Sequence, residues 1–130
     1  MREKYLIEKA KRSRLKAYAP YSNFKVGAAL LTKSGKVYAG ANVENSTFGL
    51  TVCAERVAVF KAVNRGDKNF VKIVVVTDKN PPITPCGACR QVLSEFTRDL
   101  KIVCANLQGK VERYRLKELL PEAFEKRSRD

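Results

Sequence analysis

Three cysteines are the residues of this 130-residue chain whose types and spacing are best suited to chemistry. Cys86 and Cys89 lie three residues apart directly after Pro85, where we expect a helix to begin, and Cys53 opens another predicted helix. Backbone N–H groups and the dipole at a helix N-terminus stabilise thiolates, and residues three apart there point the same way. Three thiolates that face one another can hold zinc and leave its fourth position to water, as in catalytic sites.

Two other uses of the cysteines stay open on the residues alone. Cys104 could complete a structural site of four thiolates, but it lies in a predicted strand, where a cysteine usually packs in the core. A redox-active Cys-x-x-Cys pair would use Cys86 and Cys89, yet it would give Cys53 and Glu55 no purpose.

Two charged residues follow Cys53 at the start of its helix. Glu55 is flanked by Ala54 and by apolar helix positions, so we expect a buried carboxyl group suited to general acid–base catalysis beside the metal. Arg56 is expected to donate charge-assisted hydrogen bonds to the thiolates and so to offset the net negative charge of zinc with three sulfur ligands. Arg90, next to Cys89, is a second candidate for that role.

The composition excludes several classes of protein. The chain has no histidine, which removes Ser-His-Asp and Cys-His catalysis and every zinc finger with a histidine ligand. Lys and Arg number 26 against 13 Asp and Glu, but the excess is spread thinly and no block of the sequence is purely basic. We therefore expect a solvated basic surface that binds nucleic acid nonspecifically at most.

The sequence contains no segment that suggests a membrane or an export signal. Its longest apolar run, around residues 27–31, is far shorter than the roughly 20 residues of a membrane span. The N-terminal residues are charged throughout and lack the apolar stretch of a signal peptide. We expect no membrane contact, a cytoplasmic location and reduced thiols.

Apolar periodicity and turn residues predict helices that alternate with strands. The β-branched run 73–76 predicts a strand covered on both faces, and Pro20 is expected to end the first helix. Helices are predicted at 2–18, 53–63, 86–96 and 116–120, and strands at 26–31, 37–43, 71–77, 102–105 and 111–114. This order implies a mixed sheet between helices, so we predict a single α/β domain over residues 1–130.

Several segments, which together span most of the chain, resemble one enzyme family. They are Cys53-Ala54-Glu55-Arg56, Pro85-Cys86-Gly87-Ala88-Cys89-Arg90-Gln91-Val92-Leu93, Tyr18–Leu30, Gly40–Asn45, and Leu119-Leu120-Pro121 with Phe124. In these segments the chain resembles the zinc-dependent cytidine deaminases of the small homotetrameric type. The resemblance implies an α/β/α sandwich with a mixed five-stranded sheet, and a homotetramer whose sites are shared between subunits.

The resemblance also implies the reaction. It is the hydrolytic deamination of cytidine and 2′-deoxycytidine to the uridines, with release of ammonia, in pyrimidine salvage. One zinc ion per chain would be held by Cys53, Cys86 and Cys89. Glu55 would carry protons between water and the base, and Arg56 would belong to the catalytic group.

The same resemblance assigns substrate-binding residues. Asn42 and Glu44 are expected to hydrogen-bond the ribose hydroxyls, and a carboxylate with an amide is chemically suited to a diol. Phe24 should line the base pocket together with Ala54. Phe124 is expected to reach the site of a neighbouring subunit.

One segment departs from the family pattern. Where the family commonly has Ala-x-Tyr-Pro ahead of the zinc helix, this chain has Ser46-Thr47-Phe48-Gly49, which removes a tyrosine hydroxyl available for contact between subunits. Three alternative functions remain: a blasticidin S-type deaminase, a polynucleotide cytosine-editing deaminase, and a non-enzymatic zinc protein that binds nucleic acid. The last gives no reason for Glu55.

Overall fold

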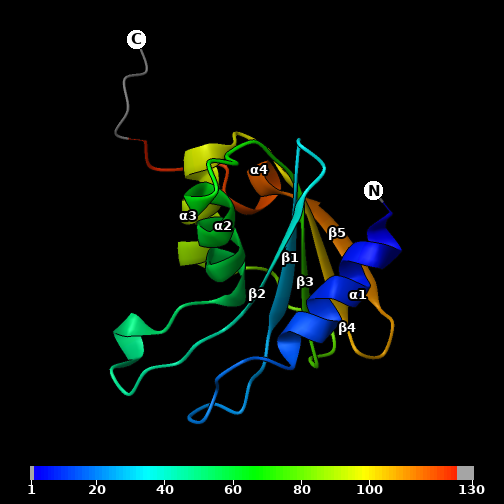
Figure 1. Cartoon of the computed structure of the whole chain (residues 1–130), viewed down its shortest axis with the longest axis vertical. Coiled ribbons are helices and arrows are strands. Elements are labelled where there is room, and N and C mark those ends of the chain that lie inside the picture. Colours follow the sequence, from blue (N-terminus) through cyan, green and yellow to red (C-terminus); the bar gives the residue numbers. More distant parts are fainter. Residues whose placement is uncertain (1, 126–130) are drawn as a thin grey trace.

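The β-branched run of the sequence lies in β3 (Phe70–Thr77), the central strand of a five-stranded sheet. The computed structural model describes residues 2–125, and its strands lie in the order β2-β1-β3-β4-β5 (Figure 1). The β3 and β4 strands are parallel, whereas the other neighbouring pairs are antiparallel. The predicted mixed sheet of five strands is confirmed.

The elements follow one another as the sequence predicts, with one short helix added. The helices are α1 (Glu3–Arg14), η1 (Phe48–Leu50), α2 (Ala54–Asn64), α3 (Gly87–Phe96) and α4 (Leu116–Leu119). The other strands are β1 (Gly27–Thr32), β2 (Val37–Ala41), β4 (Lys101–Asn106) and β5 (Val111–Arg115). The added element is η1, a single 3₁₀ turn in the segment that leads to Cys53.

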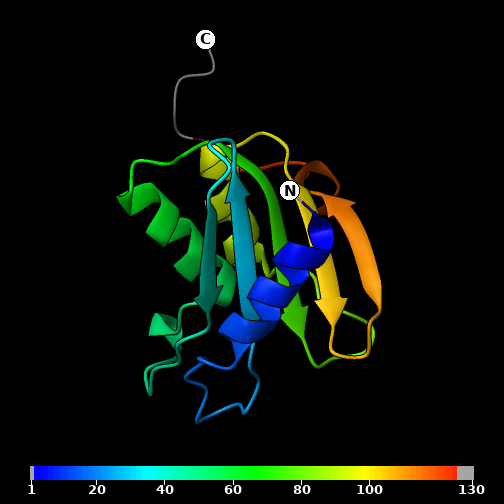
Figure 2. The same cartoon turned by 45° about the vertical axis from the view of Figure 1, so that its right-hand side comes forward.

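Both faces of the sheet are covered, as alternate residues of β3 show. Val74 and Val76 pack with Leu6 of α1 in one buried cluster, while Ile73 packs with Leu93 of α3 in the other. Accordingly α1 lies across one face, and α2 and α3 lie on the opposite face (Figure 2). The predicted layers of helix, sheet and helix are thus present.

The first helix is shorter than predicted. It ends at Arg14 rather than at residue 18. The reason is a contact distant in sequence: the Tyr18 N–H donates to the Asn42 carbonyl at 2.9 Å, and the Tyr18 carbonyl accepts from the Glu44 N–H at 2.8 Å. This pairing requires extended backbone, which the helix cannot supply.

The second strand is also shorter than predicted. It ends at Ala41 rather than at residue 43, and the chain then forms an isolated bridge between Val43 and Val52. This bridge brings the residues after β2 alongside those that lead into α2.

Between residues 2 and 125 there is no helix with the length and apolar character needed to span a bilayer.

Candidate metal centre and substrate cavity

The starts of α2 and α3 bring the three cysteines together. Cys53 is the N-cap residue of α2, Cys86 is the N-cap residue of α3, and Cys89 lies in the first turn of α3. Close packing of α2 on the sheet supports this arrangement, because a Cβ at Gly40 would lie 2.5 Å from the Ala54 carbonyl oxygen. A glycine at that position therefore lets the first turn of α2 sit directly on β2.

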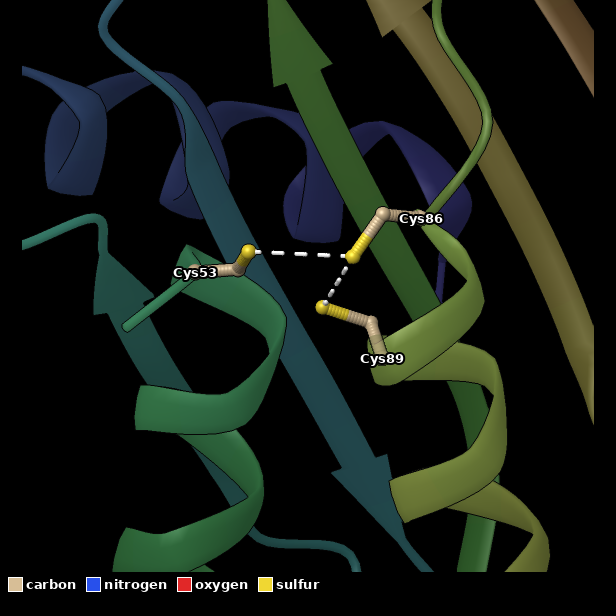
Figure 3. A group of neighbouring side chains, drawn as sticks. All are labelled: Cys53, Cys86 and Cys89. Carbon is tan, nitrogen blue, oxygen red and sulfur yellow. Dashed lines mark hydrogen bonds between the residues drawn. The ribbon is translucent and has the colours of Figure 1, made fainter. Parts of the chain in front are cut away.

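The three sulfurs form a compact triangle (Figure 3). The Sγ atoms of Cys53 and Cys86 are 3.8 Å apart, those of Cys86 and Cys89 are 3.4 Å apart, and all three lie within 4.8 Å of one another. Sulfurs on a tetrahedral zinc ion, with Zn–S bonds of about 2.3 Å, are separated by about 3.8 Å. The donor set therefore fits zinc without rearrangement of the backbone.

Cys104 does not join this group. It lies in β4, fully buried, and the one metal-binding cluster found within residues 2–125 contains the other three cysteines alone. Burial raises the pKa of the Cys104 thiol to about 12, which keeps it protonated. Cys104 is thus a core residue, as its strand environment predicts, and the protein supplies three thiol ligands rather than four.

Charges within the cluster favour thiolate at Cys53. A hydrogen bond from Cys89 lowers the pKa of Cys53 to about 5, and the Arg56 guanidinium lowers it as well. The Arg56 Nη2 donates to Cys53 Sγ at 3.4 Å and to the Thr51 carbonyl at 3.2 Å. Arg56 thus places positive charge against a sulfur that would otherwise add to the negative charge of the site.

Glu55 occupies the second position of α2 and is buried, with 5% of its surface exposed. Burial raises the pKa of its carboxyl group to about 7, and the nearby Cys53 charge acts in the same direction. Cys89 is within hydrogen-bonding reach of the carboxyl group. A carboxyl group whose pKa lies near neutrality can both accept and donate a proton.

Arg90 does not have the role predicted for it. Within residues 2–125 its hydrogen bonds go elsewhere than to a cysteine: its Nε donates to the Pro85 carbonyl at 2.7 Å, its Nη1 to the Leu119 carbonyl at 2.8 Å, and its Nη2 to Thr84 Oγ1 at 2.9 Å. The prediction that Arg90 offsets the thiolate charge by hydrogen bonding is therefore wrong. The Arg90 side chain instead connects α3 to Leu119 of α4 and to Thr84 and Pro85 in the loop that precedes α3.

A cavity of about 300 Å³ opens beside the cysteines. Its walls combine thiol, carboxyl and amide groups from segments far apart in the sequence. Its lining residues include Phe24, Asn42, Glu44, Cys53, Ala54, Glu55 and Cys86. The structure therefore brings together four of the five residues predicted to bind substrate, and it places them against the cluster and Glu55.

The side chains of Asn42 and Glu44 are already engaged with the loop that carries Phe24. Asn42 Nδ2 donates to the Phe24 carbonyl at 2.8 Å, and its Oδ1 accepts from the Val26 N–H at 2.9 Å. Glu44 Oε1 accepts from the N–H groups of Tyr21 and Ser22, at 3.0 and 3.2 Å. These bonds hold one wall of the cavity in place.

Comparison with known proteins agrees with this geometry. The family model described as the cytidine and deoxycytidylate deaminase zinc-binding region matches residues 1–106. The chain belongs to this deaminase family. It is therefore a hydrolytic deaminase, and its cofactor is zinc.

Individual relatives of this deaminase match from 74% to 95% of the chain. A cytidine deaminase of Halalkalibacterium halodurans is 51% identical over 125 residues, 95% of this chain and 95% of that protein. The crystal structure of a cytidine deaminase from Burkholderia pseudomallei has a TM-score of 0.92 and 53% identity, and the match covers 95% of this chain and 100% of that one. A blasticidin-S deaminase of Bacillus cereus is 35% identical over 104 residues, 74% of each chain.

Phe124 lies outside the cavity of its own chain. Its side chain is 72% exposed, so it does not pack into the core of its own deaminase domain. Phe48, in the segment that departs from the family pattern, is 73% exposed, and its ring centroid lies 5.9 Å from that of Tyr21. Two aromatic rings are thus presented to the surroundings of the deaminase rather than to its interior.

Sequence reasoning missed Ser22. Its hydroxyl donates to Glu44 Oε2 and accepts from the Phe24 N–H at 3.0 Å, so it joins two of the predicted substrate residues. The hydrogen bond from Ser22 is the main cause that lowers the pKa of Glu44, so the carboxyl group stays ionised. A serine two residues before Phe24 is compatible with such a turn, but the Glu44 contact spans 22 residues and has no local signal.

Proposed function

We propose that this enzyme removes the amino group of cytidine and 2′-deoxycytidine by hydrolysis and forms the uridines and ammonia. The observation that carries the proposal is the buried Glu55 carboxyl group, which lies against a triangle of thiols at the wall of a nucleoside-sized cavity. The relatives named as cytidine deaminases support the choice of substrate.

In this proposal Cys53, Cys86 and Cys89 hold zinc, which supplies a Lewis acid that makes a water molecule acidic at neutral pH. Glu55 takes a proton from the water that attacks carbon 4 of the cytosine ring, and it delivers this proton to ring nitrogen 3. Glu55 then carries the second proton of the water to the amino group that leaves as ammonia. Its pKa of about 7 suits both transfers.

Arg56 supports the metal in the same proposal. Its contact with Cys53 Sγ offsets the negative charge of three thiolates, which would otherwise weaken the acidity of the water. Because the Arg56 side chain is held by the Thr51 carbonyl as well, the guanidinium stays on the sulfur. Arg56 therefore acts in catalysis through the metal ligand rather than on the substrate.

The remaining cavity residues recognise the nucleoside. We assign Asn42 and Glu44 to the ribose hydroxyls, and Phe24 with Ala54 to the walls around the base. The hydrogen bonds between Asn42 and the Phe24 loop, one donated and one accepted by its side chain, leave one lone pair on its amide oxygen and one amide hydrogen for a ligand. The Glu44 carboxylate likewise has acceptor capacity beyond its bonds to the Ser22 turn.

We further propose a homotetramer in which Phe124 enters the cavity of a neighbouring subunit. The support is the exposed Phe124 ring together with the exposed Phe48 and Leu50 of η1, because large exposed apolar groups mark contact surfaces. Mixing a Glu55→Gln chain with a Phe124→Ala chain tests this assignment. Sites in the mixed oligomer that regain wild-type affinity for cytidine support it, and no recovery rejects it.

The cellular assignment rests on the same chemistry. Four free cysteines, three of which we assign to zinc, require a reducing compartment, which favours the cytoplasm. Conversion of cytidine to uridine there would serve pyrimidine salvage. We assign the activity to residues 1–130 as one domain, because the groups of the cavity come from segments that extend from residue 22 to residue 86.

The deciding experiment compares substrates in parallel. Purified protein is incubated with cytidine, with blasticidin S, and with an oligonucleotide at equal cytosine concentration, at low and at high salt. Turnover of cytidine, seen as loss of its absorbance band, with no change in the oligonucleotide is the expected result. A phosphodiester at the 3′ position would meet the Glu44 carboxylate and be repelled.

The alternatives have clear signatures in the same experiment. Comparable deamination of the oligonucleotide would replace the nucleoside assignment with an editing activity. A clear preference for blasticidin S would identify that substrate class instead, which the relative in Bacillus cereus makes worth including. The Glu55→Gln protein is the blank for all three substrates.

A further inference from the structure

Gln91 holds the backbone of Phe124 by both ends of its side-chain amide. The Gln91 Nε2 donates to the Phe124 carbonyl at 2.8 Å, and the Gln91 Oε1 accepts from the Phe124 N–H at 3.2 Å. One side chain thus satisfies both backbone polar groups of a residue 33 positions away. The arrangement resembles a single step of β-sheet pairing, made by an amide side chain.

The same helix holds the preceding part of this segment. Arg90, the neighbour of Gln91 in α3, donates from Nη1 to the Leu119 carbonyl at 2.8 Å. The segment from Leu119 to Phe124 is therefore attached to α3 near both of its ends. The segment after α4 returns to α3 without forming a helix or strand of its own (Figure 1).

These contacts fix the backbone of Phe124 while its ring points outward. Phe124 is 72% exposed, so the attachment buries little of this residue in its own chain. Because α3 also carries Cys86 and Cys89, the exposed ring is held at a set position relative to the metal centre. An aromatic side chain on an immobilised backbone suits insertion into a pocket, because less conformational entropy is lost when it docks.

We infer that Gln91 is a positioning residue that presents Phe124 to the cavity of a neighbouring subunit. This inference rests on the shared sites of the proposed function. Among residues 2–125, the side-chain hydrogen bonds of Gln91 both go to Phe124, and neither reaches the cavity of its own chain or the cysteines. Its effect on turnover must therefore pass through the position of Phe124.

The test is a double-mutant cycle between Gln91→Ala and Phe124→Ala. Alanine suits the helix at position 91, so the variant should fold and retain zinc. We expect Gln91→Ala to raise the KM for cytidine by about three- to tenfold, the scale of one net hydrogen bond, with little change in kcat. In the Phe124→Ala background the same substitution should add nothing to KM, because the ring that it positions is gone.

Two further variants sharpen the cycle. Gln91→Glu keeps the acceptor for the Phe124 N–H but sets a carboxylate oxygen against the Phe124 carbonyl, so its KM should rise at least as much as that of Gln91→Ala. Gln108→Ala removes a glutamine from the turn between β4 and β5 and is the control, with an unchanged KM. Hydrogen exchange at the Phe124 amide gives a readout without substrate and should be faster in Gln91→Ala than in Gln108→Ala.

The outcomes separate this inference from the proposal beneath it. A wild-type KM in Gln91→Ala, or an effect that adds in full to that of Phe124→Ala, overturns the positioning role. If Phe124→Ala itself leaves KM unchanged in an active enzyme, the shared site is rejected and the role of Gln91 with it. If the wild-type protein turns over no cytidine, the proposed function fails. In that case hydrogen exchange alone tests whether Gln91 holds the Phe124 backbone. An unchanged exchange rate of the Phe124 amide in Gln91→Ala overturns that contact.

Discussion

The two helices that begin at the cysteines have the same local design and different tasks. In both, the N-cap residue is a cysteine, and the side chain at the third helical position contacts the N-cap sulfur at 3.4 Å. That position is Arg56 in α2 and Cys89 in α3. The same geometry thus contributes a positive charge from one helix and a third sulfur from the other.

The second helical position separates the two helices further. Glu55 of α2 is buried, whereas Ala88, its counterpart in α3, is exposed. The first turn of α2 packs on β2 at Gly40, and Glu55 lines the cavity together with Val75 of β3, whereas Ala88 in the first turn of α3 is open to solvent. Burial, rather than position in a helix, makes the place of Glu55 suitable for an acid–base group.

The largest expected effect concerns Glu55. Glu55→Gln should keep the fold and zinc while turnover falls about 10²- to 10⁴-fold, because an amide preserves the shape but cannot carry a proton. Steady-state rates with cytidine measure this, and Glu8→Gln on the exposed side of α1 is the matched control. A Glu55→Gln enzyme with more than roughly a tenth of the wild-type rate would remove Glu55 from the shuttle role.

Removal of the charge that α2 contributes should have the next largest effect. Arg56→Ala should lower activity or zinc retention about 10- to 100-fold, because Cys53 loses its cationic partner. Zinc content after dialysis against a chelator and kcat at saturating zinc measure the two quantities. If both match the wild type, the contact of Arg56 with sulfur has no functional consequence.

The arginine of α3 should behave differently. Arg90→Ala should lower the free energy of unfolding by about 1–3 kcal/mol, because two carbonyls and a hydroxyl lose their donor. Zinc content should stay at one equivalent per chain. Denaturant unfolding of the zinc-loaded protein measures the stability. Loss of zinc from Arg90→Ala as readily as from Arg56→Ala would contradict the division of tasks between the two helices.

Cys104 should give the smallest effect. Cys104→Ala should lower the free energy of unfolding by about 1 kcal/mol, a typical value for a small change in the core. X-ray absorption should find three sulfur atoms and one oxygen around zinc, both in the wild type and in this variant. Four sulfur neighbours in the wild type would mean that the fourth position is closed and would contradict a catalytic centre.

The helix starts show what local reasoning achieves. Pro85 followed by Cys-x-x-Cys indicates a helix start, and residues three apart in a first turn lie on one side of it. The helix-strand order and the coverage of β3 on both faces likewise follow from periodicity and β-branched residues. These predictions were correct because each depends on neighbours within a few residues.

The errors concern contacts across the chain. The first helix was predicted too long because the pairing of Tyr18 with Asn42 and Glu44 leaves no mark near residue 18. Arg90 was predicted to face the sulfurs because it adjoins Cys89, whereas its donors reach residues as far away as Leu119. For Ser22 the partner that gives it a role is likewise distant in sequence.

The amino-acid sequence therefore contains the chemistry of the site: the thiols, the carboxyl group and the guanidinium, each at the start of a helix. The tertiary structure determines what surrounds these groups. It buries the Glu55 carboxyl group, places the Arg56 guanidinium against a sulfur, and directs the Arg90 guanidinium to the Leu119 carbonyl instead. The difference has one physical cause. Helix starts and turns depend on bonds within one turn of the chain, whereas burial and hydrogen-bond partners depend on segments that meet only when the sheet is assembled.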